Sequence, residues 1–183
     1  SSVRVKTACH PRRDQVAFSL ESSLLAEGRL SIIVAFPGAS PGPAATSKRY
    51  ILPDRWADYI TAADWNHPEL HHTYYMDAGK DYVVLLRVLD QERYFVRISW
   101  KGKAVVQQIA THYFRICPRS NSAYFQIACE FQPFPYRDPI SDIEDVFIQS
   151  AGYWNEFWST GGAVQLAESK DPRALELERR IVL

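Results

Sequence analysis

Residues 81–131, DYVVLLRVLDQERYFVRISWKGKAVVQQIATHYFRICPRSNSAYFQIACEF, decide the fold class of this chain. Runs of apolar, β-branched and aromatic residues alternate here with short charged or polar segments, such as DQE at 90–92 and KGK at 101–103. Runs of this length and composition, bounded by turn residues, are typical of β-strands. Because the runs follow one another directly, the stretch predicts serial antiparallel hairpins, and therefore a β-sandwich rather than a βαβ fold.

The last two runs of this stretch predict a hairpin whose turn lies near residues 120–121. This register places Cys117 opposite Tyr124 and Cys129 opposite His112, so the two thiols would be too far apart for a disulfide bond. The cysteines also lack the spacing of a metal site. We therefore expect free thiols, which favour a reducing compartment such as the cytoplasm. The cysteines are Cys9, Cys117 and Cys129.

Strand patterns also fill the chain before this stretch. Residues 3–8, VRVKTA, alternate like a strand, and the runs at 15–25 and 28–36 are apolar, β-branched or aromatic. Residues 37–48, PGASPGPAATSK, form a loop rich in Gly, Pro and Ser. The sequence therefore predicts a mainly β domain over residues 1–135.

The spacing of the apolar residues changes after Pro133 to steps of three and four, which is typical of an amphipathic helix. Asp138 followed by Pro139 is expected to begin this helix, and residues 161–162, both glycine, are expected to end it. We expect its apolar face to pack on the sandwich through aromatic side chains. The predicted face comprises Ile140, Ile143, Phe147, Ala151, Trp154 and Trp158.

A second helix is expected after a short extended segment at 163–169. Asp171 and Pro172 repeat the same type of helix start, and Glu176 and Arg180 have the spacing of a favourable helical ion pair. No Gly, Asn or Pro follows to end this helix before Leu183. We therefore expect the sequence to be a segment of a longer protein.

The charge balance excludes one class of partner. Lys plus Arg and Asp plus Glu each number 21 among the 183 residues, so the formal charge is zero. A nucleic-acid-binding protein would carry a basic excess. The apolar runs are also shorter than the ~20 residues that span a bilayer. We expect neither a nucleic acid nor a membrane as a partner.

Residues 63–72, ADWNHPELHH, include two histidines at a spacing that a metal site could use. His67 and His71 are four residues apart, which on a helix would direct both rings at one metal ion. Pro68 and the lack of a flanking apolar helical pattern indicate a loop instead. We therefore expect no metal here.

The same loop has side chains that suit sugar recognition. Trp65 offers a ring for stacking, and Asn66 and His67 offer hydrogen-bonding groups. We consider these three residues as candidate substrate-binding residues. The alternative interpretation is a structural surface loop without a ligand.

The carboxylates in residues 140–146, ISDIEDV, are the candidates for catalysis. Paired carboxylates can act as acid and base on a glycosidic bond. Here they lie in the first turns of the expected helix, where interaction with the helix dipole accounts for them. Nucleophile elbows, Walker loops and dinucleotide fingerprints are absent from the sequence. We therefore predict no catalytic residue and no cofactor.

Three stretches resemble a known family: YWNEFWSTGGAVQLAESKDPRALELERRIVL at 153–183, LLAEGRLSIIVAFP at 24–37 and ATHYFRI at 110–116. The first looks like the domain junction of six-hairpin glycosidases, the (α/α)6-barrel enzymes that include glycoside hydrolase family 65 and its relatives. The other two look like the N-terminal domain of those enzymes. The resemblance implies a galactose-mutarotase-like β-supersandwich at 1–135, with a linker helix and the start of a barrel at 136–183.

The resemblance also implies a function. The parent enzyme would hydrolyse or phosphorolyse a glycosidic bond, with its catalytic residues in the missing barrel. This chain would be a non-catalytic, carbohydrate-binding-like domain that packs on the barrel, meets the carbohydrate substrate only through the parent enzyme and can carry a surface for homo-oligomers. The alternative is a free-standing carbohydrate-binding or protein-interaction module. The third interpretation is a β-sandwich with its own enzyme activity.

Overall fold

The computed structural model describes residues 2–39, 63–119, 121–161 and 164–182. Most of the expected loop at 37–48 lies outside these residues, as do Ser120, Gly162 and Leu183. The elements are, in chain order, β1 (Arg4–Cys9), β2 (Gln15–Glu21), α1 (Ser23–Ala26), β3 (Ile32–Ala35), β4 (Gly38–Ala39), β5 (Ala63–Asp64), the 3-10 turn η1 (Pro68–Leu70), β6 (His71–Ala78), β7 (Tyr82–Leu89), β8 (Glu92–Lys101), β9 (Ala104–Ala110), β10 (Tyr113–Pro118), β11 (Tyr124–Gln132), α4 (Ile143–Thr160) and α5 (Ala174–Val182).

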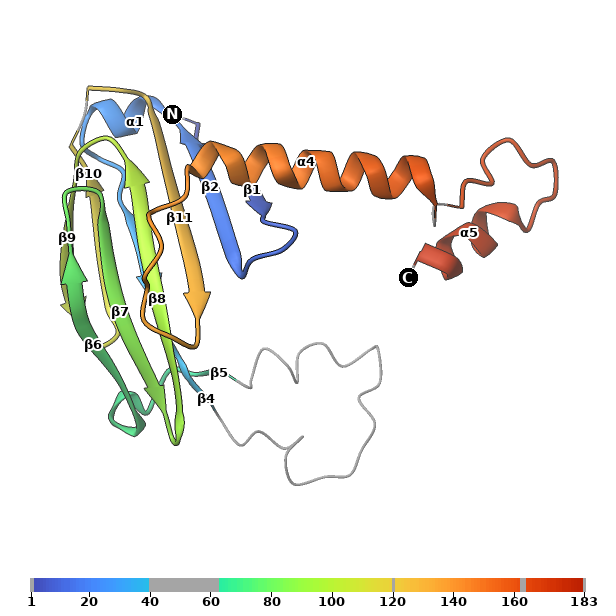
Figure 1. Ribbon diagram of the computed structural model, residues 1–183. Helices are drawn as coiled ribbons and strands as arrows, with labels where there is room; N and C mark the ends of the chain where they lie inside the picture. The colour runs from blue at the N-terminus through green and yellow to red at the C-terminus, as the bar shows by residue number, and fades with distance from the viewer. Residues whose placement is uncertain (1, 40–62, 120, 162–163, 183) are drawn as a thin grey trace.

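Antiparallel sheets form the body of the molecule (Figure 1). The larger sheet has six strands in the order β1-β2-β11-β8-β7-β6, and the smaller has three in the order β3-β10-β9. Strands β4 and β5 form a short separate pair. This arrangement confirms the predicted fold class, which is a mainly β, antiparallel sandwich followed by two helices.

The main hydrophobic core follows the alternation of the strands. Leu85, Ile98 and Ile127 come from the six-stranded sheet, and Phe114 and Ile116 come from β10 of the three-stranded sheet. All are at most 1% exposed. Full burial of one such side chain contributes roughly 1.5–3 kcal/mol. The alternating runs in residues 81–131 therefore bring the two sheets together.

The predicted hairpin between the last two runs is wrong, because β10 and β11 belong to different sheets. Cys117 lies opposite Val105 on β9, whereas Cys129 lies opposite Val16 on β2 and Ile98 on β8. The KGK segment likewise connects two sheets, from β8 to β9. Both connections pass from one sheet to the other, because the strands before and after them lie on opposite sides of the core. Cys9, Cys117 and Cys129 are free thiols.

Helix α4 begins four residues later than predicted. Asp142, not Asp138, is the N-cap, and its carboxylate accepts a hydrogen bond from the backbone N–H of Glu144 at 2.9 Å. Arg97 donates to the backbone carbonyls of Asp138 and Pro139 at 2.8 and 3.3 Å. These bonds hold the chain in an extended path before the helix. Gly161 ends α4, as predicted.

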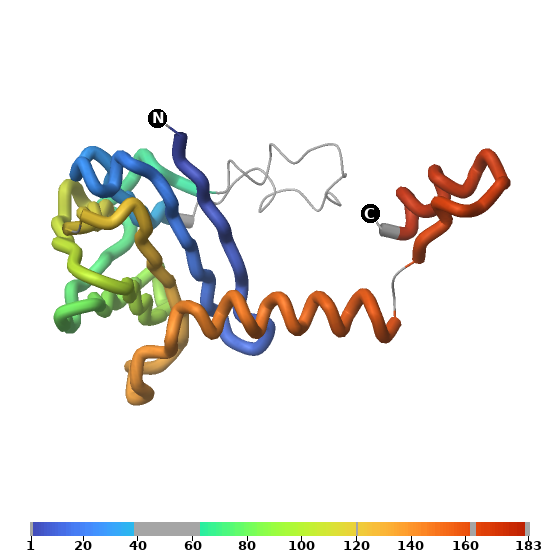
Figure 2. The backbone as a smooth tube through the Cα atoms, turned by 90° about the horizontal axis from the view of Figure 1, so that it is seen from above, coloured from blue at the N-terminus to red at the C-terminus, as the bar shows by residue number. Residues whose placement is uncertain are grey.

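The tryptophans of α4 do not pin it to the sandwich, contrary to expectation, although Phe147 packs against the buried cluster at its base. Ile143 and Val146 are buried against the sheet, with Ala17 and Ala128 in the same cluster. Trp154 and Trp158, further along the helix, are 51% and 55% exposed. Figure 2 shows the reason, since the helix continues beyond the sandwich.

Helix α5 has the predicted ion pair but begins at Ala174, later than the predicted start at Asp171 and Pro172. The Asp171 carboxylate accepts from the backbone N–H of Arg173 at 2.8 Å, and Glu176 pairs with Arg180 at 2.8 Å. The backbone N–H of Leu166 donates to Glu178 at 2.7 Å, so the preceding segment folds back on the helix. No helix among the described residues is long and apolar enough to span a bilayer.

Candidate functional site

The candidate sugar-binding loop connects β5 to β6 and is ordered by Asp64. The Asp64 carboxylate accepts from the backbone N–H of Asn66 at 2.8 Å and from Nδ1 of His67 at 2.7 Å. Trp65 is 48% exposed, and its ring centroid lies 5.9 Å from that of Tyr113 on β10. The structure therefore places Trp65, Asn66 and His67 together on one exposed loop, with the indole against the sandwich.

The His67–Asp64 pair affects both titrations. The hydrogen bond to the carboxylate raises the pKa of His67 above its usual range. The hydrogen bonds from the backbone of Asn66 and the ring of His67 lower the pKa of Asp64. His67 therefore keeps its proton to a higher pH than an isolated histidine does, and its exposed ring lies on the same loop as Trp65.

The two histidines at metal-type spacing are separated by the fold. His67 precedes the 3-10 turn η1, and His71 is the first residue of β6. His71 is only 3% exposed, so the expectation that the whole stretch forms an exposed loop is wrong at this residue. Within the described part of the chain, no group of three or more His, Cys, Asp or Glu side chains could hold a metal ion.

His71 belongs to a buried polar cluster that the sequence reasoning missed. Arg87 is fully buried, and its guanidinium lies 2.9 Å from Nδ1 of His71 and 2.6 Å from Oγ1 of Thr73. The rings of His71 and His112 are stacked with centroids 3.8 Å apart. The signal was present in β7, because Val83, Leu85 and Arg87 alternate and therefore point to the same, inner face.

The carboxylates of residues 140–146 each have a partner in the fold. Asp142 caps α4 and pairs with Lys101 at 2.6 Å. Glu144 accepts from the Gln126 amide at 2.8 Å, and Asp145 lies 3.6 Å from Arg13. Lys101 is the first cause that lowers the pKa of Asp142. These contacts match the expectation that the carboxylates stabilise the helix start.

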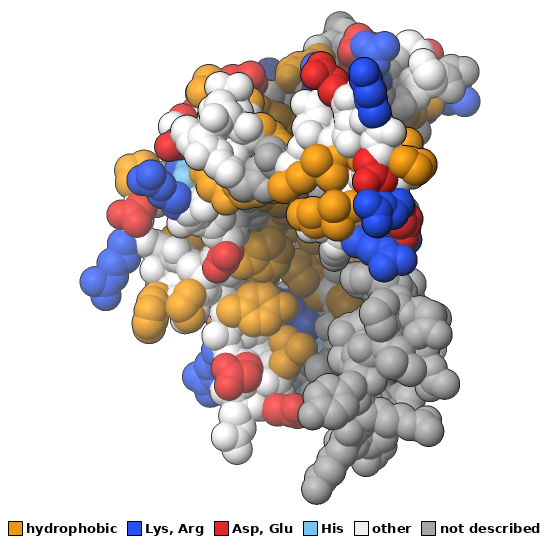
Figure 3. Space-filling view, turned by 90° about the vertical axis from the view of Figure 1, so that its right-hand side faces the viewer, with side chains coloured by type: hydrophobic (Ala, Val, Ile, Leu, Met, Phe, Trp, Pro, Cys, Tyr) orange, Lys and Arg blue, Asp and Glu red, His pale blue; other side chains and the backbone are white. Residues whose placement is uncertain are grey.

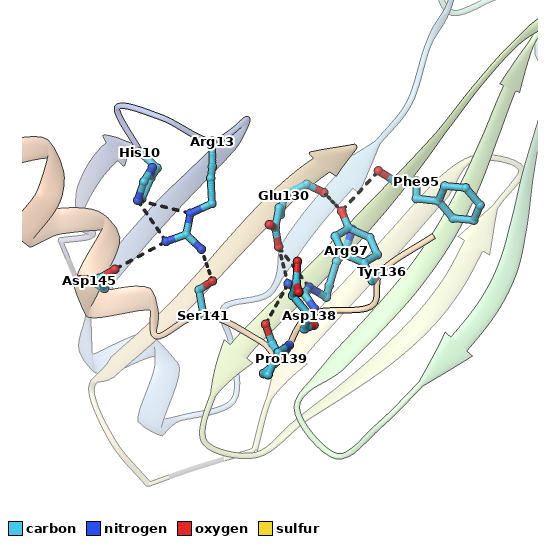
Figure 4. Close-up of polar contacts among 10 residues, drawn as sticks. All are labelled: His10, Arg13, Phe95, Arg97, Glu130, Tyr136, Asp138, Pro139, Ser141 and Asp145. Carbon is cyan, nitrogen blue, oxygen red and sulfur yellow. Dashed lines mark hydrogen bonds and ion pairs between the residues drawn. The ribbon is translucent and has the colours of Figure 1, made fainter. Parts of the chain in front are cut away.

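A second polar network anchors the connection between β11 and α4 (Figure 4). Arg97 and Glu130 form an ion pair at 2.6 Å, and both side chains are largely buried. The guanidinium also lies over the ring of Tyr136 at 4.3 Å. The Tyr136 hydroxyl accepts from the backbone N–H of Arg97 and donates to the carbonyl of Glu130, and burial raises its pKa.

The β1–β2 turn supports the helix start from the other side. Arg13 donates to Ser141, lies within hydrogen-bond distance of Nε2 of His10 and approaches Asp145 at 3.6 Å. Figure 4 shows these contacts between the turn and the first turn of α4. The base of the helix is thus held by arginines from two parts of the chain.

An open groove lies beside the Arg97 network. Its volume is about 440 Å³, and its lining includes Met76, Tyr82, Phe95, Tyr136 and Ile140. The Tyr82 hydroxyl donates to Asp77 at 2.9 Å, so this polar pair is already satisfied within the fold. Figure 3 shows hydrophobic side chains gathered around a hollow on the side from which α4 projects.

The far half of α4 presents a group of aromatic side chains, which we call the aromatic overhang. Neighbouring rings in it have centroids 5.2 to 5.5 Å apart. All of its members are at least 40% exposed. They are Tyr153, Trp154, Phe157 and Trp158.

Taken together, the fold and its sites define an antiparallel β-sandwich with a projecting aromatic helix and an exposed, aromatic polar loop. Comparisons with protein-family models, with curated proteins and with solved structures found no match for this chain. A function proposed for it therefore rests on its own geometry and on the resemblance in its sequence.

Proposed function

We propose that the chain is the non-catalytic β-sandwich module of an enzyme that hydrolyses or phosphorolyses glycosidic bonds. In this proposal α4 links the sandwich to an all-α barrel, which supplies the acid and the activated water or phosphate. The order of elements and the family resemblance support the proposal. The observation that carries it is the aromatic overhang.

The overhang continues the face by which α4 packs on the sheet. Ile143, Val146 and Ser150 are buried, and steps of three and four residues lead from them to Trp154, Phe157 and Trp158. These residues therefore share one side of the helix. The sheet covers only the first half of this apolar side. A layer of helices from a partner domain, packed on the second half, would bury the exposed rings as the sheet buries Ile143 and Val146.

The loop with Trp65 would then contribute to sugar binding at the rim of the active site. An exposed indole can stack on the apolar face of a pyranose ring, and the Asn66 amide can hydrogen-bond its hydroxyl groups. The raised pKa of His67 favours a charged donor beside them. The same features support the second candidate function, a carbohydrate-binding module that acts without a barrel.

The test is to express residues 1–183 alone and joined to the coding sequence that follows them, and to assay both on aryl glycosides and on disaccharides with and without phosphate. We expect turnover only from the longer protein. Turnover by residues 1–183 that is lost on Asp142→Asn or Glu144→Gln would contradict the proposal. So would a reading frame without an all-α domain.

Two variants separate the candidate functions. Trp158→Ala should cost little in residues 1–183, where the ring is 55% exposed, but should destabilise the longer protein, where the partner would cover that ring. Trp65→Ala should raise the KM of the longer protein. If residues 1–183 bind sugars by calorimetry and lose binding on Trp65→Ala, while Trp158→Ala has the same effect in both proteins, the carbohydrate-binding module is the better description.

A further inference from the structure

We infer that His71, Arg87 and His112 form an acid-sensitive latch, which holds the segment 64–73 on the sandwich near neutral pH and releases it in acid. The latch does not depend on the proposed function. It concerns a segment that includes Trp65, and it would act in any protein that contains this chain.

The hydrogen bond from Arg87 requires His71 to be neutral. Arg87 can only donate, so Nδ1 of His71 must accept at 2.9 Å. Nε2 of His112 donates to the Pro68 carbonyl at 2.8 Å. Nδ1 of His112 lies 2.7 Å from the Thr73 hydroxyl, and that hydroxyl accepts from Arg87. The His71 ring thus turns a lone pair, not a proton, towards the buried cation.

The same three side chains connect parts of the chain that are distant in sequence. Arg87 donates to the carbonyls of Pro37 and His72, at 3.1 Å each. His112 binds the Pro68 carbonyl in η1. A Cβ on Gly38 would lie 2.8 Å from the His71 ring, so β4 also packs closely on the cluster. Loss of the cluster would remove these contacts of η1 and leave the start of β6 held by its pairing with β7.

The backbone of His112 has an unfavourable conformation, and the contacts of the latch offset its energetic cost. Its φ is 64°, in the left-handed region that costs a non-glycine residue roughly 1–3 kcal/mol. The stack on His71 and the bonds to Thr73 and Pro68 hold it there. When these contacts are lost, the turn between β9 and β10 gains by relaxing, which favours release.

Acid acts directly on these contacts. A proton on Nδ1 of His71 removes an acceptor and places a second positive charge beside Arg87. The charged and titratable groups that act on His71 are Arg87 on β7, His112 in the β9–β10 turn, His72 on β6 and Asp64 on β5. Of these, Asp64 favours protonation and the other three oppose it. Asp64 alone does not offset the three groups that oppose protonation of His71.

The direction and size of the effect follow from His71. Burial, His112 and Arg87 lower its pKa from 6.5 to about 4 in the closed form. An open segment would return it to about 6.5, so the open form binds more protons between these values. The opening equilibrium constant should therefore rise as the pH falls through this window, by up to ~300-fold.

The experiment is an NMR titration of the 183-residue chain from pH 7.5 to 4, which follows backbone amides, the Trp65 indole and the histidine ring nitrogens. We expect the amides of 64–73 and the indole to leave their folded positions in acid, while those of Ile98 and Ile127 remain. His71→Asn retains a neutral acceptor and should abolish the change. His72→Asn, the same substitution at the adjacent exposed residue, should not.

Each measurement can overturn the latch. It fails if the release persists in His71→Asn, if His72→Asn abolishes it, or if the core amides are lost at the same pH as the segment. Ring nitrogen shifts of the unmodified chain provide the independent readout if His71→Asn does not fold. They should show His71 as the neutral Nε2–H tautomer until release. A His71 ring that becomes cationic near pH 6.5 with no change in 64–73 would exclude the latch.

Discussion

The two buried arginines of the six-stranded sheet are stabilised in different ways. Arg97 faces outward, where Glu130 neutralises it and Tyr136 covers it. Arg87 faces the core, where imidazoles, a hydroxyl and carbonyls are its partners within the described chain. Hydrogen bonds to neutral groups satisfy its terminal donors, but its buried Nε–H has no partner among the described residues and its charge stays uncompensated. The Phe36 ring, 5.1 Å from the guanidinium, is the other group that favours the cation.

The pair on the candidate loop gives a prediction at the same scale. Asp64→Asn should lower the pKa of His67, because the hydrogen bond to the carboxylate is the first cause of its raised value. The His67 ring is exposed, so the effect of this ion pair on stability should be small. A histidine-detected NMR titration measures the change directly. Glu69→Gln, also near the ring, should have a smaller effect, and an unchanged His67 titration in Asp64→Asn would contradict the pairing.

At the scale of elements, α4 contains a buried half and an exposed half within one helix. Ile143→Ala should therefore cost ~2–5 kcal/mol, as for other buried isoleucines. Trp154→Ala should cost well under that in residues 1–183, because the ring is 51% exposed. Urea unfolding compares the two. A larger loss for the tryptophan would show that its ring is covered in solution.

Helix α5 should contribute little to the stability of the sandwich. A helix of nine residues is too short to be stable alone in water. Leu175, Leu177 and Ile181 are each more than half exposed, so it lacks a packed apolar face. Truncation after Lys170 should change the urea midpoint only slightly. If this truncation destabilises a monomer as much as Ile143→Ala does, α5 belongs to the core of the sandwich.

The elements also show how far the sequence determines the fold. Strand positions in residues 81–131 could be predicted, because alternation and turn residues are local signals. The sheet to which each strand belongs could not, since a short loop such as KGK serves equally for a hairpin and for a crossing between sheets. The β7–β8 hairpin was predicted correctly, and β10–β11 was not.

The start of α4 was missed for a similar reason. Asp138-Pro139 has the local features of a helix start, but Arg97, distant in sequence, binds the carbonyls of both residues. The exposed loop with Trp65 was predicted from its polar composition. The support under it, Arg87 with His71 and His112, depends on three separate segments that only the folded chain brings together.

At the scale of the whole molecule, the Arg97 network determines how the sandwich meets α4. Arg97→Ala would leave Glu130 buried without its partner and free the carbonyls that fix residues 138–139. Breaking a buried pair in this way costs about 3–5 kcal/mol. Urea unfolding should show that loss. Arg97→Ala combined with Glu130→Ala should lose less than the sum of the two single changes, and simple additivity would show that the pair is not coupled.

The projecting helix acts as a lever arm. With 18 residues and a rise of 1.5 Å per residue, α4 is about 27 Å long. A rotation of only about 10° at its base would move its far end by roughly 5 Å, which is the pitch of one helical turn. The contacts of Arg13 and Arg97 at that base therefore set where anything attached beyond Thr160 lies relative to the loop that carries Trp65. A substitution in these contacts would in this way move the far end of α4 relative to that loop.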